Sequence, residues 1–212
     1  MLFSPISRPR LFRGPRVDRP LIAPHVQLDR LSLRPYRADD AADWFAIQSI
    51  GEVNHYMKWP ERDEARSRAH LRDRTHHTRL AHVNDFLALA IEVDGHVVGD
   101  VSLRLKAVHP DARNVEIAWM LHPDYSGHGY ATEAVSAMLD LAFDELGARW
   151  ATALIDLTNV RSIAVAERLG LRGIPLDGDS IAFFASPAVR EAHAHRMQLH
   201  HDLVRRLERR DS

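Results

Sequence analysis

The stretch that decides the fold is "SGHGYATEA", residues 126–134. Gly127 and Gly129 stand at the start of a segment whose apolar residues recur at helical spacing until Gly147. Glycine allows a tight turn and the close approach of another group to the backbone. The first N–H groups of a helix have no partner within the helix, and they attract anions, phosphates above all. The stretch therefore predicts a loop that holds a phosphate at a helix N-terminus.

The loop differs from two well-known phosphate motifs. No Gly-Lys-Ser/Thr follows the glycines, which excludes the P-loop of nucleoside triphosphatases. The third glycine and the later acidic residue of the dinucleotide fingerprint are also missing. What remains is a strand, a short loop with Gly-x-Gly, and a helix.

The elements around the loop follow from periodicity and turn residues. Two apolar runs flank Asp94-Gly95, which predicts a β-hairpin. Alternation and short apolar runs predict strands over 28–36, 114–121, 150–157 and 181–185. Helical spacing predicts helices over 37–49, 130–146 and 159–171, a solvated helix over 61–79, and a loop over 54–60.

The connections predict how the strands pair. Strands between residues 86 and 121 are joined by short loops, so they should be antiparallel. A helical crossover precedes the strand at 150, so it should run parallel to the strand at 114. The result is a mixed sheet with helices on both sides.

The tail fits two patterns. Residues 194–203 alternate as a strand would, whereas a helix from Ser186-Pro187 would align Val189, Ala192, Arg196, Leu199, Leu203 and Leu207. We expect a strand followed by a short terminal helix.

Composition bounds the class of protein. The chain has 212 residues, a formal net charge of −1 and no cysteine. This length suits one domain, and the charge gives no basic field for nucleic acid. The lack of cysteine excludes a disulfide scaffold, a thiolate zinc site and a cysteine nucleophile. No apolar run approaches the roughly 20 residues of a membrane span, and we expect a cytoplasmic location.

The first 24 residues differ from the rest. They contain five prolines and five arginines against a single acid, Asp18. This composition predicts an extended arm over residues 1–24, partly disordered or draped on the domain, and a single domain over residues 25–212.

Four segments in order identify a family resemblance. "YSGHGYATEA" resembles the acetyl-CoA loop of the GNAT superfamily of acetyltransferases, and its "GYATEA" ending resembles the Rim-type branch, which includes ribosomal-protein N-terminal acetyltransferases. "LDRLSLRPYRADDAADW" resembles the opening strand and helix of that branch, "EVNHYMKWP" its substrate-side loop, and "NVRSIAVAERLGL" its Asn-x-x-Ser helix. The resemblance covers roughly residues 28–172.

The resemblance implies a fold and an activity. The fold would be α+β (mixed α/β), with a mostly antiparallel GNAT-type sheet of six to seven strands flanked by helices on both faces. The activity would be N-acyl transfer from acetyl-CoA, or another acyl-CoA, to a primary amine that attacks the thioester directly. The acceptor would be a protein N-terminus, a lysine or a small amine, and a homodimer is compatible with the family.

A second hypothesis is a catalytically degenerate domain that binds CoA as a sensor or binds a partner. Many GNAT enzymes use a tyrosine as acid in the helix after the second crossover strand. Residues 164–166 are Ala-Val-Ala, so that tyrosine is absent.

The resemblance also implies site residues. Those expected to bind the cofactor are Leu121, Ser126, Gly127, His128, Gly129, Tyr130, Ala131, Thr132, Asn159 and Ser162. On the acceptor side we expect Glu52, Tyr56 and Trp59.

Proton transfer needs further groups. Glu116, partly buried beside Val115 and Ile117, is the predicted base, and His122, acting through a water, is the rival. Ser162 is the predicted acid or hydrogen-bond donor to the thiolate, unless Asn159 and Ser162 only cap the helix.

The clustered histidines raise the question of a metal site. His193, His195, His200 and His201 lie close in sequence, but no carboxylate or cysteine completes a ligand set. We therefore expect no metal.

Overall fold

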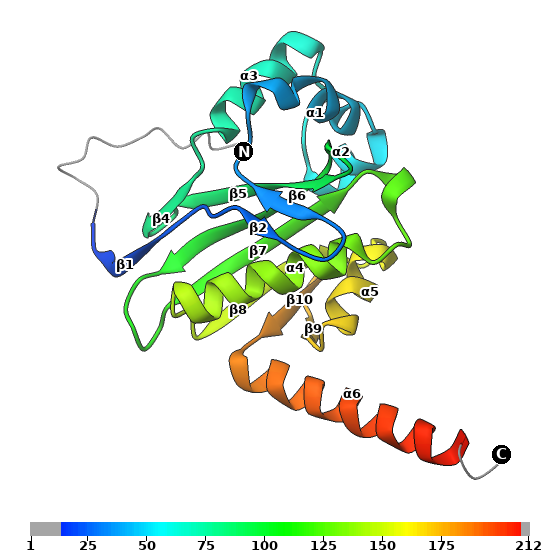
Figure 1. Cartoon of the computed structure of the whole chain (residues 1–212). Coiled ribbons are helices and arrows are strands. Elements are labelled where there is room, and N and C mark those ends of the chain that lie inside the picture. Colours follow the sequence, from blue (N-terminus) through cyan, green and yellow to red (C-terminus); the bar gives the residue numbers. More distant parts are fainter. Residues whose placement is uncertain (1–13, 209–212) are drawn as a thin grey trace.

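A computed structural model describes residues 14–208, and for residue 197 and residues 199–208 it describes the backbone alone. Its main sheet has eight strands in the order β2-β3-β5-β6-β7-β8-β10-β9, and β1 and β4 form a separate pair (Figure 1). The strands are β1 Arg16–Ile22, β2 Val26–Gln27, β3 Ser32–Arg34, β4 Arg79–His82, β5 Phe86–Val93, β6 His96–Ala107, β7 Asn114–Leu121, β8 Trp150–Asp156, β9 Arg172–Pro175 and β10 Ser180–Ala185. The helices are α1 Ala41–Gln48, α2 Gly51–Met57, α3 Glu64–Arg74, α4 Tyr130–Asp140, α5 Val160–Arg168 and α6 Pro187–Glu208.

Strand directions agree with the expectation from loop lengths. Every neighbouring pair in the main sheet is antiparallel except β7 and β8, which run parallel. That parallel pairing extends only from Asn114↔Trp150 to Glu116↔Thr152. The second halves of both strands therefore have no ladder between them, and the sheet opens there.

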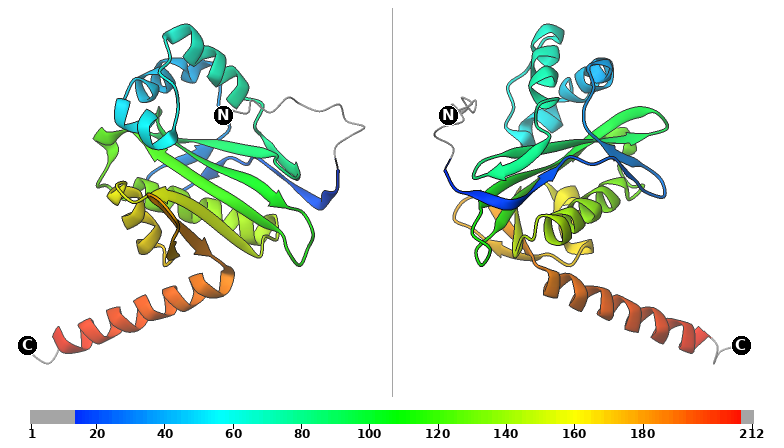
Figure 2. Two further views of the ribbon diagram at one scale, coloured as in Figure 1. Left: turned by 180° about the vertical axis from the view of Figure 1, so that it is seen from behind. Right: turned by 60° about the vertical axis from the view of Figure 1, so that its left-hand side comes forward.

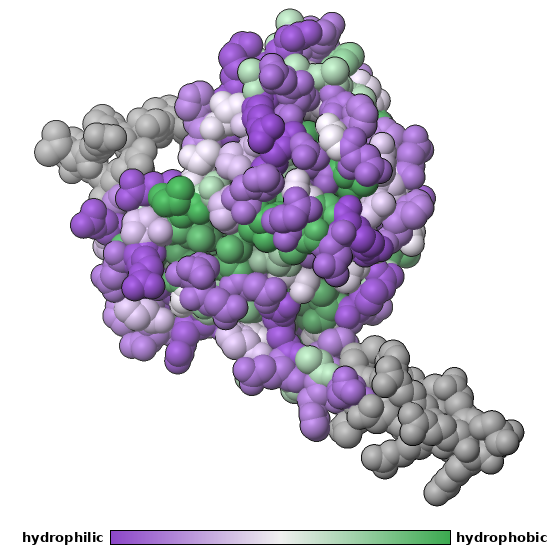
Figure 3. Space-filling view, in the orientation of Figure 1, coloured by the Kyte–Doolittle hydropathy of each residue, from purple (hydrophilic) through white to green (hydrophobic). Residues whose placement is uncertain are grey.

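Helices cover both faces of the sheet (Figures 1 and 2). On one face, α4 and α5 bury residues such as Val135, Met138 and Ala166 against the sheet in the larger core. On the other face, α1 and α3 bury Trp44 and Leu71 against β5 and β6 in a second core. The layer of α1 to α3 turns mostly hydrophilic side chains outward, and apolar surface forms a band across the middle (Figure 3). The predicted fold class is confirmed, with more strands than the six to seven expected.

The second core contains a buried ion pair. Arg74 Nη2 lies 2.6 Å from Asp100 Oδ1, and the two side chains are 5% and 1% exposed. The Tyr36 hydroxyl donates to Asp100 Oδ2 at 2.9 Å. Burial alone would lower the pKa of Arg74, but the Asp100 carboxylate outweighs it and the pKa is raised. The guanidinium also lies 5.1 Å from the centroid of the Trp44 ring. The pair ties α3 to β6.

His70 stays neutral beside this pair. Burial, followed by the charge of Arg74, lowers the pKa of His70 to about 3. Its Nδ1 lies 2.7 Å from Gln48 Nε2, which joins α3 to the end of α1. Because the His70 imidazole is neutral at pH 7, it places no second positive charge next to Arg74.

Two segments differ from the sequence-based expectation. A loop was expected over residues 54–60, but residues 51–57 form helix α2. Its residues Val53 and Asn54 are buried. The helix expected over 61–79 is shorter than predicted, because β4 begins at Arg79. One face of this helix, α3, is shielded from solvent, since Leu71 and Arg74 are both buried. The aromatic composition of residues 54–60 favoured a loop over helix α2. The mostly charged sequence of α3 gave no sign of its buried face.

The tail also differs. Residues 187–208 form one long helix, α6, so the strand expected over 194–203 and the short terminal helix were wrong. The Ser186 hydroxyl accepts a hydrogen bond from the Val189 N–H at 3.3 Å, as an N-cap does. The strand expected over 181–185 is present as β10, and β9 was not anticipated. The far end of α6 extends away from the rest of the chain (Figure 2).

The described part of the predicted arm is the strand β1. It pairs with β4, and Val17 and Leu21 are buried in the larger core. Residues 1–13 of the arm lie outside the described residues. Within the described part of the chain, no helix is long and apolar enough to cross a membrane.

We predict that Arg74→Ala destabilises the fold by about 3–5 kcal/mol, because it leaves the Asp100 carboxylate buried without a partner. Urea unfolding measures the change. Arg72→Ala, on the exposed face of the same helix, is the control and should change stability by less than about 0.5 kcal/mol. An Arg74→Ala protein as stable as the control would contradict the role given to the pair.

Candidate active site

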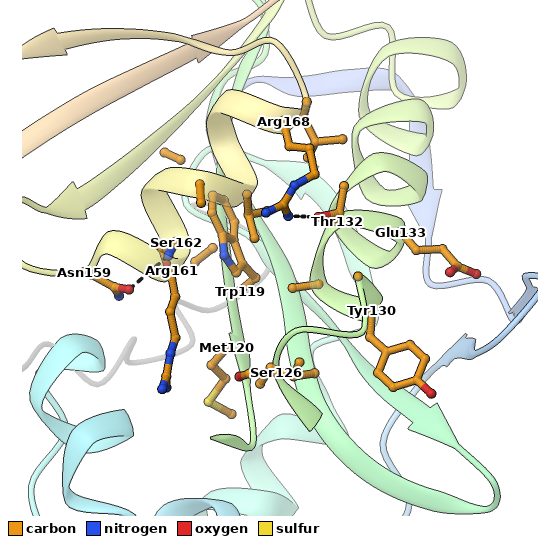
Figure 4. A pocket seen from close by; sticks show the side chains of 18 of the residues that line it. Trp119, Met120, Ser126, Tyr130, Thr132, Glu133, Asn159, Arg161, Ser162 and Arg168 are labelled. Atoms are coloured by element: carbon orange, nitrogen blue, oxygen red, sulfur yellow. Dashed lines mark hydrogen bonds between the residues drawn. The ribbon is translucent and has the colours of Figure 1, made fainter. Parts of the chain in front are cut away.

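A cleft of about 1250 Å³ opens where β7 and β8 separate. Residues 117–121 of β7 and 153–156 of β8 line its floor. Its walls come from α4 and α5 on one side and from α2 on the other (Figure 4). Three segments far apart in the sequence therefore meet at one opening in the sheet.

The glycine loop forms one end of the cleft. Gly127 and Gly129 have φ angles of 84° and 83°, in the left-handed region that favours glycine. Helix α4 begins directly after Gly129, with no side chain capping it. The backbone N–H groups of residues 127–132 have no acceptor within the described part of the chain. Six consecutive donors, at the positive end of a helix, form a cradle for an anion.

Arg30 braces this cradle from the turn between β2 and β3. Its Nη1 donates to the carbonyl oxygen of His128 at 2.6 Å, and its Nε donates to Glu133 Oε2 at 2.9 Å. Its guanidinium carbon lies 5.4 Å from the centroid of the Tyr130 ring. Arg30 thus joins the loop, the first turn of α4 and the start of the sheet.

The predicted cofactor residues all line this cleft: Leu121, Ser126, Gly127, His128, Gly129, Tyr130, Ala131, Thr132, Asn159 and Ser162. Asn159 caps α5, since its Oδ1 accepts from the Ser162 N–H at 3.1 Å. The capping that we weighed against a catalytic role is therefore present, and it leaves the Asn159 amide hydrogens and the Ser162 hydroxyl on the cleft side (Figure 4).

Two of the three predicted acceptor-side residues lie at the cleft. Glu52 Oε1 is 3.4 Å from Arg161 Nη1, and the Tyr56 hydroxyl donates to the Thr158 carbonyl oxygen at 3.3 Å. Both contacts link α2 to the region where α5 begins, across the opening. Trp59 does not line the cleft. Its ring packs 5.8 Å from that of Trp44, at the edge of the second core.

The predicted base, Glu116, does not line the cleft. Its side chain is 42% exposed and pairs with Lys106 Nζ at 3.2 Å. It stands in the part of β7 that is still paired with β8, before the strands separate. The assignment of Glu116 as base therefore stays a prediction, and the lining of the cleft does not support it.

His122 does not line the cleft either. Its Nδ1 accepts from the Asp124 N–H at 3.3 Å and caps the short turn at Pro123–Tyr125. This contact engages only Nδ1 of the ring, so the assignment of His122 as the rival base stays a prediction.

Sequence reasoning missed several charged residues of the cleft. Asp156 ends β8, and its Oδ1 accepts from both the hydroxyl and the N–H of Thr158, at 2.6 and 2.9 Å. These two bonds lower the pKa of Asp156. Three arginines, Arg30, Arg161 and Arg168, also line the cleft, as do Asp29, Glu133 and Asp140. Arg168 donates to Thr132 Oγ1 at 2.9 Å (Figure 4). The spacing Asp-x-Thr-Asn-x-x-Ser was a signal for Asp156, and nothing marked the arginines.

Over the described residues, no group of three or more His, Cys, Asp or Glu side chains could hold a metal ion. His193 and His195 belong to α6, a helix and not the extended segment considered above. Nothing is described of the side chains of His200 and His201.

The comparisons with known proteins agree with this geometry. Residues 30–172 match the family model described as "Acetyltransferase (GNAT) domain". A relative from Bacillus subtilis (strain 168), "Uncharacterized N-acetyltransferase YnaD", is 35% identical over 57 residues. That match spans 27% of this chain and 34% of the relative, so it covers only about a third of the relative's length.

Solved structures share the fold. Mycobacterium smegmatis RimJ, in complex with CoA-disulfide, aligns with a TM-score of 0.62 at 23% identity over 80% of this chain and 90% of its own. The microcin C7 self-immunity acetyltransferase MccE, in complex with acetyl-CoA and AMP, aligns with a TM-score of 0.60 at 18% identity over 75% of this chain and 93% of its own. The family model matches well over half of the sequence. With its glycine loop, opened sheet and flanking helices, the chain belongs to the GNAT family of acetyltransferases.

Proposed function

We propose that this protein transfers an acetyl group from acetyl-CoA to a primary amine, by direct attack of the amine on the thioester. The observation that carries the proposal is the cradle of six free N–H groups, which opens directly onto the gap between β7 and β8. When its anionic group is bound in that cradle, a ligand with an extended arm can place the arm in the gap between the two strands.

The parts of acetyl-CoA fit the parts of the cleft. The pyrophosphate suits the N–H groups of residues 127–132 at the start of α4. The pantetheine arm carries two amides and suits the gap, where strand groups lack partners. Asn159, whose Oδ1 is occupied by the cap, still has its Nδ2 hydrogens for an amide oxygen of that arm.

The gap offers a donor for the thioester oxygen. The His122 N–H donates to the Val98 carbonyl oxygen of β6. In an antiparallel ladder the direction alternates, so the N–H groups of Trp119 and Leu121 point away from β6, into the gap. We assign Trp119 N–H to the thioester carbonyl, where negative charge builds up during attack.

The reaction then balances as follows. The neutral amine forms a C–N bond with the carbonyl carbon, the C–S bond breaks, and CoA leaves as a thiolate. The proton lost by the amine offsets the one that the thiolate takes up. We assign to the Ser162 hydroxyl, which lines the cleft at the first turn of α5, a hydrogen bond to the departing sulfur.

The opposite side of the cleft suits a cationic acceptor. Asp156 and Glu52 bring two carboxylates to its lining, and Arg161 offsets the charge of Glu52 but not that of Asp156. The hydrogen bonds from Thr158 lower the pKa of Asp156 and keep it charged, which suits it to hold an ammonium before deprotonation. Because a carboxylate of this kind is a weak base, we assign it to amine binding and let water remove the proton.

We predict that Arg30→Ala weakens acetyl-CoA binding about tenfold, because it removes the charged hydrogen bonds that fix the cradle. Titration calorimetry measures the affinity. Arg30→Lys should recover only part of it, since lysine keeps the charge but lacks the guanidinium fork that spans His128 and Glu133. Arg19→Ala, an exposed guanidinium on β1, is the control and should bind as the parent does. Equal affinity for all four proteins would contradict the role of Arg30.

We predict that the purified protein binds acetyl-CoA and releases free thiol only when an amine is added. Thiol release is measured with a panel of acceptors: peptides with a free N-terminus, N-terminally blocked lysine peptides and small amines. Binding without release for any acceptor would contradict transfer and favour a CoA sensor. No binding would contradict the whole proposal.

A pair of acid-to-amide variants tests the cleft assignment. Asp156→Asn should lower kcat/KM for the amine about tenfold, because it removes the charge that holds the ammonium. Glu116→Gln, outside the cleft, should leave kcat/KM within about twofold of the parent. The reverse result would support Glu116 as the base.

A further inference from the structure

We propose that Arg168 of α5 and Arg190 of α6 form a binding site for the 3′-phosphate of CoA, so that the C-terminal helix helps to select the donor. The inference rests on the proposed use of an acyl-CoA donor. It assigns a role to α6, which lies outside residues 30–172, the segment that matches the family model.

A polar stripe on α4 leads away from the cradle. Thr132, Ser136 and Asp140 stand four residues apart, so they share one face of the helix. Arg168 Nη1 donates to Thr132 Oγ1 at 2.9 Å, and Arg190 Nη2 donates to Ser136 Oγ at 2.9 Å. Two guanidinium groups therefore lie along α4, beginning at the cradle.

A second cavity, of about 340 Å³, lies between these arginines. Its lining comprises Ser136, Arg168, Leu169, Arg190, Glu191, His193 and Ala194. Ser136, Arg168 and Leu169 also line the main cleft, so the two cavities adjoin. A group bound in the cradle can reach this cavity without leaving the surface.

The spacing matches the donor. Ser136 follows Tyr130 by six residues, which is about 9 Å along a helix axis. In CoA one ribose separates the pyrophosphate from the 3′-phosphate. With the pyrophosphate in the cradle and the pantetheine in the sheet gap, the ribose lies over α4 and its 3′-phosphate faces the stripe.

The charges favour an anion at the Arg168 end. Among the residues whose side chains are described, the partner of Arg168 is the neutral Thr132 hydroxyl, so its charge and its other donors are free for a phosphate. Arg190 also pairs with the Asp140 carboxylate, which orients it but offsets part of its charge. Glu191 lies at the same cavity and opposes an anion there. Arg168 is therefore the main ligand and Arg190 the second.

Helix α6 is held firmly at this point. His193 Nε2 donates to the Arg168 carbonyl oxygen at 3.1 Å. A Cβ on Gly170 would lie 2.3 Å from His193 Cγ, so α6 approaches α5 as closely as it does only because residue 170 is glycine. The contact fixes Arg190 beside Ser136.

The test compares CoA with dephospho-CoA, which lacks only the 3′-phosphate, by titration calorimetry on the full chain. We expect the parent to bind CoA at least about tenfold more tightly, as a charged hydrogen-bond pair implies. Arg168→Ala should abolish most of this preference and Arg190→Ala part of it. Neither variant should change the affinity for dephospho-CoA.

The controls distinguish phosphate binding by Arg190 from a purely structural role of this residue. Arg196→Ala, an exposed arginine of α6 outside both cavities, should keep the full preference. If Arg190→Ala weakened both ligands equally, the residue would only hold α6 in place and the inference would be overturned. Equal binding of both ligands by the parent would also overturn it, while leaving the proposed function intact. Failure of the parent to bind either ligand would instead reject the proposed donor.

Discussion

The constraint on which the rest depends is the loss of pairing between β7 and β8 after Glu116↔Thr152. A parallel ladder that ran to the strand ends would satisfy every N–H and C=O group and would close the sheet. Because it stops, backbone groups face an open cleft, and the helices that follow each strand diverge with it. The N-terminus of α4 and the first turn of α5 are then both presented to one space.

The other face of the sheet keeps this opening from collapsing. The buried Arg74–Asp100 pair joins α3 to β6, the neighbour of β7, and Met120 packs into the same core from β7. The floor of the cleft is thus supported from beneath by a charged contact that tolerates little displacement. Helix α2, which lies between that core and the contacts of Glu52 and Tyr56, borders the other end of the cleft.

The sequence predicted the parts that local rules govern. Asp94-Gly95 gave the hairpin, and the Gly127-x-Gly129 pattern gave the anion loop, since both depend on backbone conformations that few residues adopt. The parts set by distant contacts were missed. Glu116 looked like a base because its neighbours on the strand are apolar, but where β7 and β8 separate decides whether it reaches the cleft. Arg30 looked like one arginine among many, because its partner Glu133 is 103 residues away.

The 103 residues between Arg30 and Glu133 have a consequence for how the protein folds and for how a bound ligand affects its stability. The brace of the binding loop forms only when the first strands of the domain meet the middle of the chain, a contact of long sequence separation. A partly folded chain would lack this brace and would bind a donor less tightly. A ligand bound at this loop would therefore stabilise the whole domain and not the loop alone, by about 2.7 kcal/mol at a concentration of 100 Kd. It would also slow proteolysis, because proteases cut the opened chain.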